Sequence, residues 1–479
     1  MSGQPTRRPG DRIIRRRLQA TQVIELPAAP ERPTIPNVRR HAKLFALALL
    51  ALVVICGGLL TLPVFSRNGE WTPFVDAVFT STSAATVTGL VVVDTANHWN
   101  IAGQVLILAL IQAGGLGFMV GANLLLRALQ RSAAGLRETL LLQDGAPTLS
   151  LREAAELSGQ IVRFTLFMEG IGAVVLATRF AFDYPIHLAV WYGIFHAISA
   201  FCNAGFDLQG GFRSVSGYQD SIFVNVMLMI LIQAGSLSYL FFADIAIRRR
   251  FARLALETKI ILLMNALMLV LGASIFLGAE WNASLSGVPV VERPLVALFQ
   301  SVSARTAGFA TINFDTATNI TLFTWVAIMF VGGASGSTAG GVKLTTVGVV
   351  GLAVVSTVRG QLEPQVFGRR IPTTLIFRAM AVIAIMFAAH FVATLGVVIS
   401  EHQTGGDVPF IDILVEAMSA LATVGVSTGI TPALSDPAKI VLCATMFFGR
   451  LGPLTAVYAL QIRQHVVRYK FPEALVRIG

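Results

Sequence analysis

Four short stretches of this sequence place small and hydroxyl-bearing residues directly before a glycine. They are SAATVTGL (83–90), SAFCNAGF (199–206), SVSARTAGF (301–309) and SALATVGV (419–426). Glycine reaches backbone angles that are closed to other residues, and it adds no side chain to a crowded space. Backbone carbonyl oxygens around such a tip can replace the hydration shell of an ion. The chemistry predicted for these stretches is therefore cation coordination by the main chain.

The residues predicted to form a selectivity filter make up four groups of four. The first and fourth groups carry TVTG- or TVG-like runs, whereas the second offers an asparagine and the third an arginine. This difference predicts an asymmetric filter. Its residues are Thr86, Val87, Thr88 and Gly89; Cys202, Asn203, Ala204 and Gly205; Arg305, Thr306, Ala307 and Gly308; and Ala422, Thr423, Val424 and Gly425.

Each tip follows an apolar segment that begins close to a proline. The prolines are Pro73, Pro185, Pro294 and Pro409, and subtraction gives proline-to-glycine intervals of 16, 20, 14 and 16 residues. Proline is favoured in the first turn of a helix, so each interval predicts a short helix followed by an extended tip. Irregular backbone at membrane depth is tolerated where it lines a water-filled cavity. The negative ends of the short helices would point toward that cavity and favour a cation.

The composition is that of a membrane protein. Of 479 residues, 54% are hydrophobic and 13% are charged, against about 25% charged in soluble domains. The three cysteines are far apart and give neither a disulfide framework nor a metal-ligand spacing. No nucleophile–base set or cofactor loop is found, so we expect neither an enzyme nor an organic cofactor. The net charge is +10, but the lysines and arginines cluster between and after the apolar segments. In a membrane protein this distribution is an orientation signal, so nucleic acid is not expected as a partner.

The order long helix, short helix, tip, long helix recurs along the chain. It predicts an all-α integral membrane protein with four helix–pore loop–helix repeats around one pseudo-fourfold pore and eight transmembrane helices. The second long helices share glycines at Gly114, Gly235, Gly333 and Gly449. The expected regions are an Arg-rich tail (1–43), repeats one to four (44–131, 155–253, 257–359 and 371–468) and a C-terminal tail (469–479).

The charge distribution predicts the orientation of the chain. Ten of the 36 lysines and arginines fall in residues 1–43, and most of the others fall in the segments around 127–163, 248–258, 343–378 and 463–477. Positive charge near spanning helices is typical of the cytoplasmic side. We therefore expect a multi-pass protein of a bacterial-type inner membrane, in contact with lipid and with both termini in the cytoplasm. The first apolar run starts only at Leu44, so a signal peptide is not expected.

Two features of the inner helices suggest a gate below the filter. A run rich in Gly and Ser interrupts the third repeat, and Arg450 is the only charge deep in its helix. The predicted gate comprises Gly332, Gly333, Ala334, Ser335, Gly336, Ser337, Thr338, Ala339, Gly340, Gly341, Lys343 and Arg450. A kinked helix without a gating role is the alternative for the run. Pairing with loop carbonyls or a carboxylate is the alternative for Arg450, and both roles can hold together.

Arg305 is unusual beside a cation site. We expect its side chain to point behind the filter and to pair with an acid, either Glu169 or Glu416. The residues alone do not decide between these two.

With these motifs in place, the sequence resembles the TrkH/KtrB superfamily of potassium-translocating subunits, on the KtrB side. TVTGLVVVDT (86–95), SAFCNAGF, ARTAGF, GGASGSTAGGVK and FFGRLGPLT carry the resemblance. It implies potassium uptake, often stimulated by sodium, by a homodimer with one pore per subunit and a cytosolic ring of nucleotide-binding regulatory subunits of the KtrA/TrkA kind. In related plant transporters a serine at the first filter glycine accompanies sodium selectivity, so Gly89 favours potassium.

Two transport mechanisms are compatible with these motifs. The first is a gated, channel-like pore for potassium. The second is a sodium- or proton-coupled potassium symporter that works by alternating access, an architecture usually built from two inverted repeats. Four units running in the same direction around one axis favour the pore.

Overall fold

The computed structural model describes residues 36–133, 151–361 and 364–462. Contacts within the chain divide it between Lys43 and Leu44, and the residues from Leu44 onward form one compact unit. The long and medium helices are α1 (Pro36–Leu60), α4 (Ile101–Ala133), α6 (Leu151–Phe180), α8 (Ile222–Ser236), α9 (Tyr239–Arg248), α10 (Leu256–Glu280), α12 (Asn319–Phe330), α13 (Leu344–Val358), α14 (Thr373–Thr404) and α16 (Asp436–Ile462).

Four further helices lead into the tips, and we call them the pore helices. They are α2 (Phe74–Ala85), α7 (Ile186–Phe201), α11 (Arg293–Ser303) and α15 (Phe410–Ala422). Three of the predicted prolines are N-cap residues and the fourth, Pro294, lies in the first turn of α11. The helices therefore begin where the sequence predicts, because proline needs no hydrogen-bonded N–H in the first turn.

Short elements complete the described chain. They are α3 (Thr95–His98), the 3₁₀ turns η1 (Pro63–Phe65), η2 (Ser216–Tyr218), η3 (Phe251–Arg253), η4 (Phe314–Thr316) and η5 (Thr431–Ala433), and an antiparallel hairpin of β1 (Gln365–Val366) and β2 (Arg369–Arg370).

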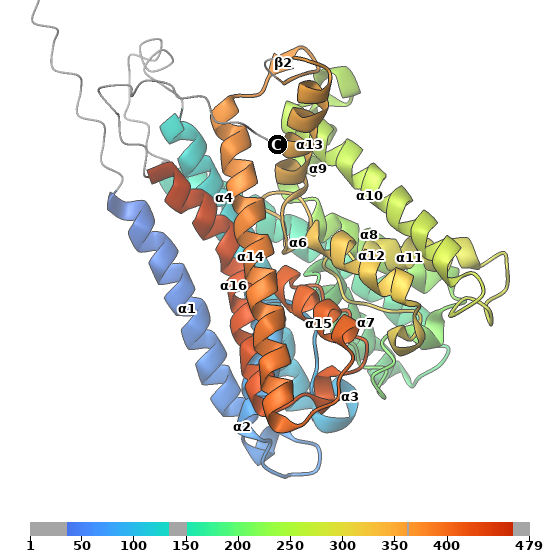
Figure 1. Cartoon of the computed structure of the whole chain (residues 1–479). Helices are drawn as coiled ribbons and strands as arrows, with labels where there is room; N and C mark the ends of the chain where they lie inside the picture. Colours follow the sequence, from blue (N-terminus) through green and yellow to red (C-terminus); the bar gives the residue numbers. More distant parts are fainter. Residues whose placement is uncertain (1–35, 134–150, 362–363, 463–479) are drawn as a thin grey trace, which may run out of the picture. The chain divides into compact units, whose positions relative to one another are not determined.

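The pore helices pack in a closed cyclic order. Each contacts the second long helix of the repeat before it: α7 contacts α4, α11 contacts α8, α15 contacts α12, and α2 contacts α16. Figure 1 shows α15 and α7 as short helices among the long ones. The first repeat thus meets the last, and the four tips are directed toward a common region.

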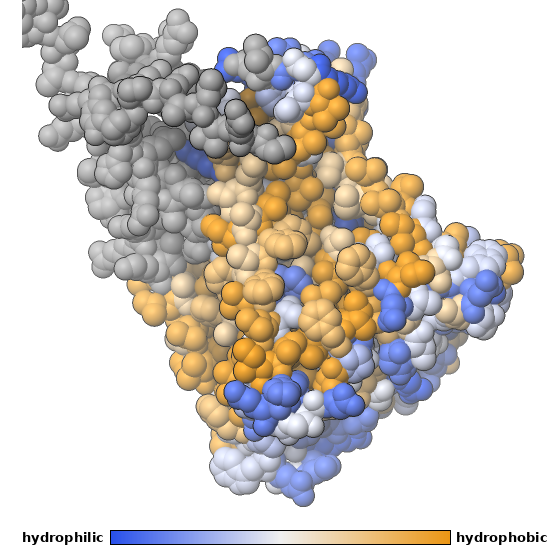
Figure 2. All heavy atoms as spheres, viewed as in Figure 1, coloured by the Kyte–Doolittle hydropathy of each residue, from blue (hydrophilic) through white to orange (hydrophobic). Residues whose placement is uncertain are grey.

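Apolar side chains on the outer helices face away from the protein. On α10 and α14, Val270, Phe387 and Phe391 are each 66% exposed, and Figure 2 shows hydrophobic surface over the middle of the visible helices with hydrophilic residues near their ends. Such a surface suits lipid. Four described helices are long and apolar enough to cross a membrane, or five if α8 and α9 count as one span. The expected number of eight spanning helices therefore stays a prediction.

Two of the inner helices are broken rather than continuous. The second repeat was expected to end in one long helix, but α8 and α9 meet at an angle of 93°. Ser238 lies at the break with φ 70°, outside the helical region. In the third repeat the chain leaves the helix after Phe330 and re-enters it at Leu344, as its glycine and serine content predicts.

Candidate functional site

A ring of four glycines lies where the pore helices end. Gly89, Gly205, Gly308 and Gly425 have φ values of 93°, 71°, 77° and 92°, which glycine adopts without steric cost. A methyl group on any of them would contact the carbonyl that precedes the glycine of the next repeat. On Gly205, for example, it would lie 2.7 Å from the Ala307 oxygen. The order runs from the first repeat to the fourth and closes on Thr88. The structure therefore brings the four predicted tips together.

Within the described part of the chain, the carbonyl groups of this ring have no hydrogen-bond partner. They belong to the residues just before the glycines, namely Thr88, Ala204, Ala307 and Val424, all of which are buried. None of these four oxygens accepts a hydrogen bond from a described residue. Buried carbonyls nearly always have a partner. Four unpartnered oxygens in one ring form an electronegative site that suits a dehydrated cation.

The backbone also takes an unusual conformation two residues before each glycine. Val87, Asn203, Thr306 and Thr423 have φ values of 51°, 59°, 73° and 49°. Positive φ is uncommon for residues other than glycine, and such conformations cluster at functional sites because the surrounding structure has to hold them. Its recurrence in all four tips indicates that one backbone path is repeated around the ring.

Serine hydroxyls fix the tips to their pore helices. Ser83 Oγ accepts from the N–H of Gly89 and Ser419 Oγ from that of Gly425, each at 3.0 Å. Ser199 instead donates its hydroxyl to the carbonyl of Phe206 at 2.7 Å. These bonds use hydroxyls of the motifs for positioning, so the ring oxygens are left to coordinate.

The glycines of the second long helices allow close contact with the pore helices. A methyl group on Gly114, Gly235 or Gly449 would overlap the carbonyl of Ala85, Phe201 or Leu421 in the last turn of the same repeat's pore helix. Gly333 differs, because it lies against the Ser236 carbonyl instead. The register assigned from sequence therefore describes three repeats, and the third departs from it because α12 ends at Phe330.

The predicted gate loop, residues 332–341, lies directly against the ends of two pore helices. Thr338 donates its hydroxyl to the Phe201 carbonyl at 3.3 Å, and Gly340 lies against the Ala422 carbonyl. The N–H groups of Ala334 and Thr338 donate to Ser236 and Gly235 oxygens at 2.8 and 3.2 Å. Carbonyls at a helix end lack helical donors, so the loop satisfies those exposed by the break between α8 and α9.

Arg450 connects the gate loop to the first repeat. Its guanidinium donates to the Thr338 carbonyl at 2.5 Å and to the Gly114 carbonyl at 3.0 Å, and it lies 4.2 Å from the centre of the Phe118 ring. Lys343 donates to the Ala339 carbonyl at 2.5 Å. Arg450 therefore pairs with one carbonyl of the loop and one of α4, in line with the structural alternative that its sequence position left open.

Among the residues that the structure describes, no acid pairs with Arg305. Its Nη1 donates to the Asn265 side-chain oxygen at 2.5 Å, while Nε and Nη2 have no partner among the described residues. Glu169 accepts from Gln112 at 3.1 Å, and Glu416 accepts from Ser427 and Thr431. The expected pairing with Glu169 or Glu416 is therefore wrong, because both carboxylates are engaged by neighbouring hydroxyl, amide or thiol groups.

Two acidic residues beyond the tips were not singled out by sequence reasoning. Asp207 follows the second tip, and Asp94 lies in the segment after the first, where it caps α3 and accepts from Phe212 N–H at 3.0 Å. Burial raises the pKa of Asp207 to about 6, and the charge of Asp94 adds to this rise. In the sequence, Asp207 lies two residues after the filter glycine Gly205, and this position could have identified it as a functional residue. We call these two carboxylates the mouth acids.

A helical protein with exposed apolar outer helices and a ring of unpartnered carbonyls at the ends of its pore helices has the features of the class of membrane ion-transport proteins. A family model described as "TrkH: Cation transport protein" matches residues 46–465. The chain is 36% identical to the potassium/sodium uptake protein NtpJ of Enterococcus hirae, over 91% of this chain and 97% of that protein. It is 33% identical to the Ktr system potassium uptake protein B of Bacillus subtilis, over 89% and 94%.

A solved structure has the same fold. The potassium transporter TrkH of Vibrio parahaemolyticus superimposes with a TM-score of 0.68 at 19% identity, over 90% of this chain and 86% of that one. The protein belongs to the TrkH family of cation transport proteins. The family predicted from the sequence motifs is therefore confirmed, as is the helical membrane fold.

Proposed function

We propose that the protein is the potassium-selective, ion-translocating subunit of an uptake system and works as a gated pore. The ring of unpartnered carbonyls at Thr88, Ala204, Ala307 and Val424 carries this proposal. Two relatives are named as potassium uptake proteins, and one of these names also includes sodium. Potassium is the proposed cargo, with sodium as a second candidate ion and no organic cofactor or catalysis.

Cell growth and potassium flux test this proposal. Cells that lack potassium uptake should grow at micromolar potassium when they express this chain, and purified protein in liposomes should pass unitary potassium currents. Slow turnover with a fixed sodium or proton stoichiometry, without unitary currents, would instead support the coupled symporter.

The proposed assembly is a homodimer in a bacterial inner membrane with both termini in the cytoplasm. The names of relatives in Ktr systems support a multicomponent assembly. A cytosolic ring of nucleotide-binding subunits is the proposed regulator. Purification of the chain alone and with such a subunit, followed by mass measurement of the complex, would test both partners.

We further propose that the gate loop blocks the inner side of the filter and that Arg450 holds it there. Replacing Arg450 by Ala removes both of its hydrogen bonds to carbonyls, at Thr338 and Gly114. Basal potassium flux without a regulator should then rise several-fold while thermal stability falls, since bonds to charged groups contribute about 1.5–3 kcal/mol. Arg450→Lys should give an intermediate flux, because one ammonium matches the fork of the guanidinium poorly. Unchanged flux in folded Arg450→Ala protein would assign Arg450 a structural role only.

A further inference from the structure

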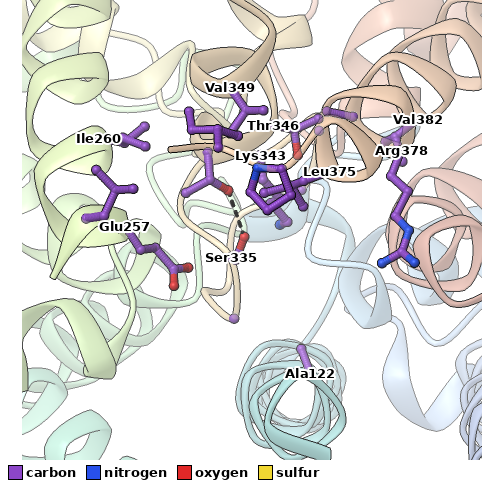
Figure 3. A pocket seen from close by; sticks show the side chains of 18 of the residues that line it. Ala122, Glu257, Ile260, Ser335, Lys343, Thr346, Val349, Leu375, Arg378 and Val382 are labelled. Carbon is purple, nitrogen blue, oxygen red and sulfur yellow. Dashed lines mark hydrogen bonds between the residues drawn. The ribbon is translucent and has the colours of Figure 1, made fainter. Parts of the chain in front are cut away.

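A cavity of about 450 Å³ lies beside the gate loop, between α10, α13, α14 and α4. Its volume falls within the range of about 300–1,000 Å³ that is typical of small-molecule sites. Most of its wall is apolar and includes Ile260, Val349 and Val382, which project from three different helices in Figure 3. The gate loop forms another wall through Ser335 and its neighbours.

The charged lining of this cavity is mostly positive. Of the described residues that line it, Lys343, Arg370, Arg378 and Arg450 are basic and Glu257 is the one acid. Figure 3 shows Arg378 reaching from α14 toward the open space, with Glu257 on the opposite wall. The positive side chains repel a potassium ion at this short range. The cavity is therefore a poor binding site for the transported cation and a better one for an anion.

The cavity lies on the strongly basic side of the protein. The helix that supplies Arg378 begins just after the hairpin that carries Arg369 and Arg370, and α9 ends at Arg248, the first residue of a run of three arginines. Basic segments are expected on the cytoplasmic side, and basic pockets between spanning helices on that side typically bind anionic lipid headgroups. A cationic end joined to apolar walls matches a molecule with a phosphate and a hydrocarbon chain.

We propose that this cavity binds an anionic phospholipid, with its phosphate at Arg378 and Lys343 and part of an acyl chain against Ile260, Val349 and Val382. Because Lys343 also donates to the Ala339 carbonyl, the bound lipid is in contact with the gate loop. The binding site stands on the cavity alone. The effect of the bound lipid on flux rests on the proposed gate. The lipid is expected to stabilise the gate loop in its closed position and so to lower the flux.

The binding test is native mass spectrometry of the detergent-purified protein, titrated with phosphatidylglycerol or phosphatidylcholine. Phosphatidylglycerol should be retained and phosphatidylcholine should not replace it. Arg378→Gln should weaken binding roughly tenfold, as the loss of one charge-assisted bond implies, and Arg378→Lys should restore most of it. Arg369→Gln is the matched control, since Arg369 lies in β2, nine residues before Arg378 in the sequence, and is not part of the cavity lining.

Leu375→Trp provides a second test from the apolar wall. It adds bulk to the cavity without changing charge, so it should also reduce lipid retention. Inorganic phosphate and ATP distinguish the sources of the anion. If either displaces the lipid or binds without it, the site takes a soluble phosphate and the proposal is wrong. Equal retention by Arg378→Gln and Arg369→Gln would also overturn it.

Flux measurements separate the site from the gate. Basal flux in phosphatidylglycerol liposomes should be lower than in phosphatidylcholine liposomes for the wild type, and this difference should disappear in Arg378→Gln. Retained lipid without any effect on flux would leave the binding site in place and remove its link to the gate.

Discussion

At the scale of single residues, Gly89 is constrained by the neighbouring chain as well as by its own backbone angle. A side chain there would contact the Ala204 carbonyl, one of the ring oxygens. Gly89→Ser should therefore displace an oxygen from the ring and reduce the preference for potassium over sodium roughly tenfold, equivalent to about 1.4 kcal/mol. Reversal potentials of liposome-reconstituted protein measure this ratio.

Gly278→Ser is the matched control for this change. Gly278 lies in α10, and a methyl group added there meets nothing within 4 Å. Its selectivity should equal that of the wild type. If Gly89→Ser also keeps the wild-type ratio, the glycine ring is not the filter.

The mouth acids predict a dependence on external pH. Burial raises the pKa of Asp207 to about 6 from its usual 3.8. The raised pKa therefore lowers the folding stability at neutral pH, and this cost declines as the pH falls below about 6 and is gone below the usual value of 3.8. The effect on transport has the opposite sign, because the carboxylate attracts cations. Uptake at subsaturating potassium should fall a few-fold on acidification.

Asp207→Asn tests the source of this dependence. The variant should show the low uptake rate at every pH and lose the step near pH 6, while its rate at saturating potassium stays close to that of the wild type. A step that persists in the variant would assign the titration to another group.

At the scale of elements, the sequence predicts helix starts better than helix breaks. The prolines mark the first turn of each pore helix because their effect is local. The break between α8 and α9 depends on a distant segment, since the gate loop supplies donors to the carbonyls of Gly235 and Ser236. The partner of Arg305 is likewise set by α10, through Asn265. Such tertiary contacts leave no periodic signal in the sequence.

Close packing between α4 and α2 gives a sharp stability prediction. Gly114→Ala would force a methyl group onto the Ala85 carbonyl, whereas Gly117→Ala, one turn along the same helix, meets nothing within 4 Å. The first should destabilise the protein by about 1–3 kcal/mol. The second should be neutral or slightly stabilising, because alanine favours helix more than glycine does. Thermal unfolding in detergent compares the two, and equal melting temperatures would contradict the packing described for these helices.

At the scale of the whole molecule, the ring of repeats closes only where the first meets the fourth. Besides the contact of Gly425 with Thr88, this junction contains an ion pair between Lys439 of α16 and Asp76 of α2. The distance from Nζ to Oδ1 is 2.8 Å, and the side chains are 10% and 17% exposed. These groups are far apart in sequence, so the pair fixes the two ends of the repeat series together.

Removing one partner of this pair should cost more than removing both. Lys439→Met leaves the Asp76 carboxylate poorly compensated in a mostly buried place and should destabilise the protein by about 3 kcal/mol. Adding Asp76→Asn should recover part of that loss, giving a coupling energy that a double-mutant cycle of unfolding measures. Arg179→Met is the control, because the Arg179–Asp183 pair is 30% and 40% exposed and such pairs contribute at most about 1 kcal/mol. Additive losses for Lys439 and Asp76 would mean that the pair does not hold the junction, and closure would then depend on the packing of α2 against α16 and on the glycine ring.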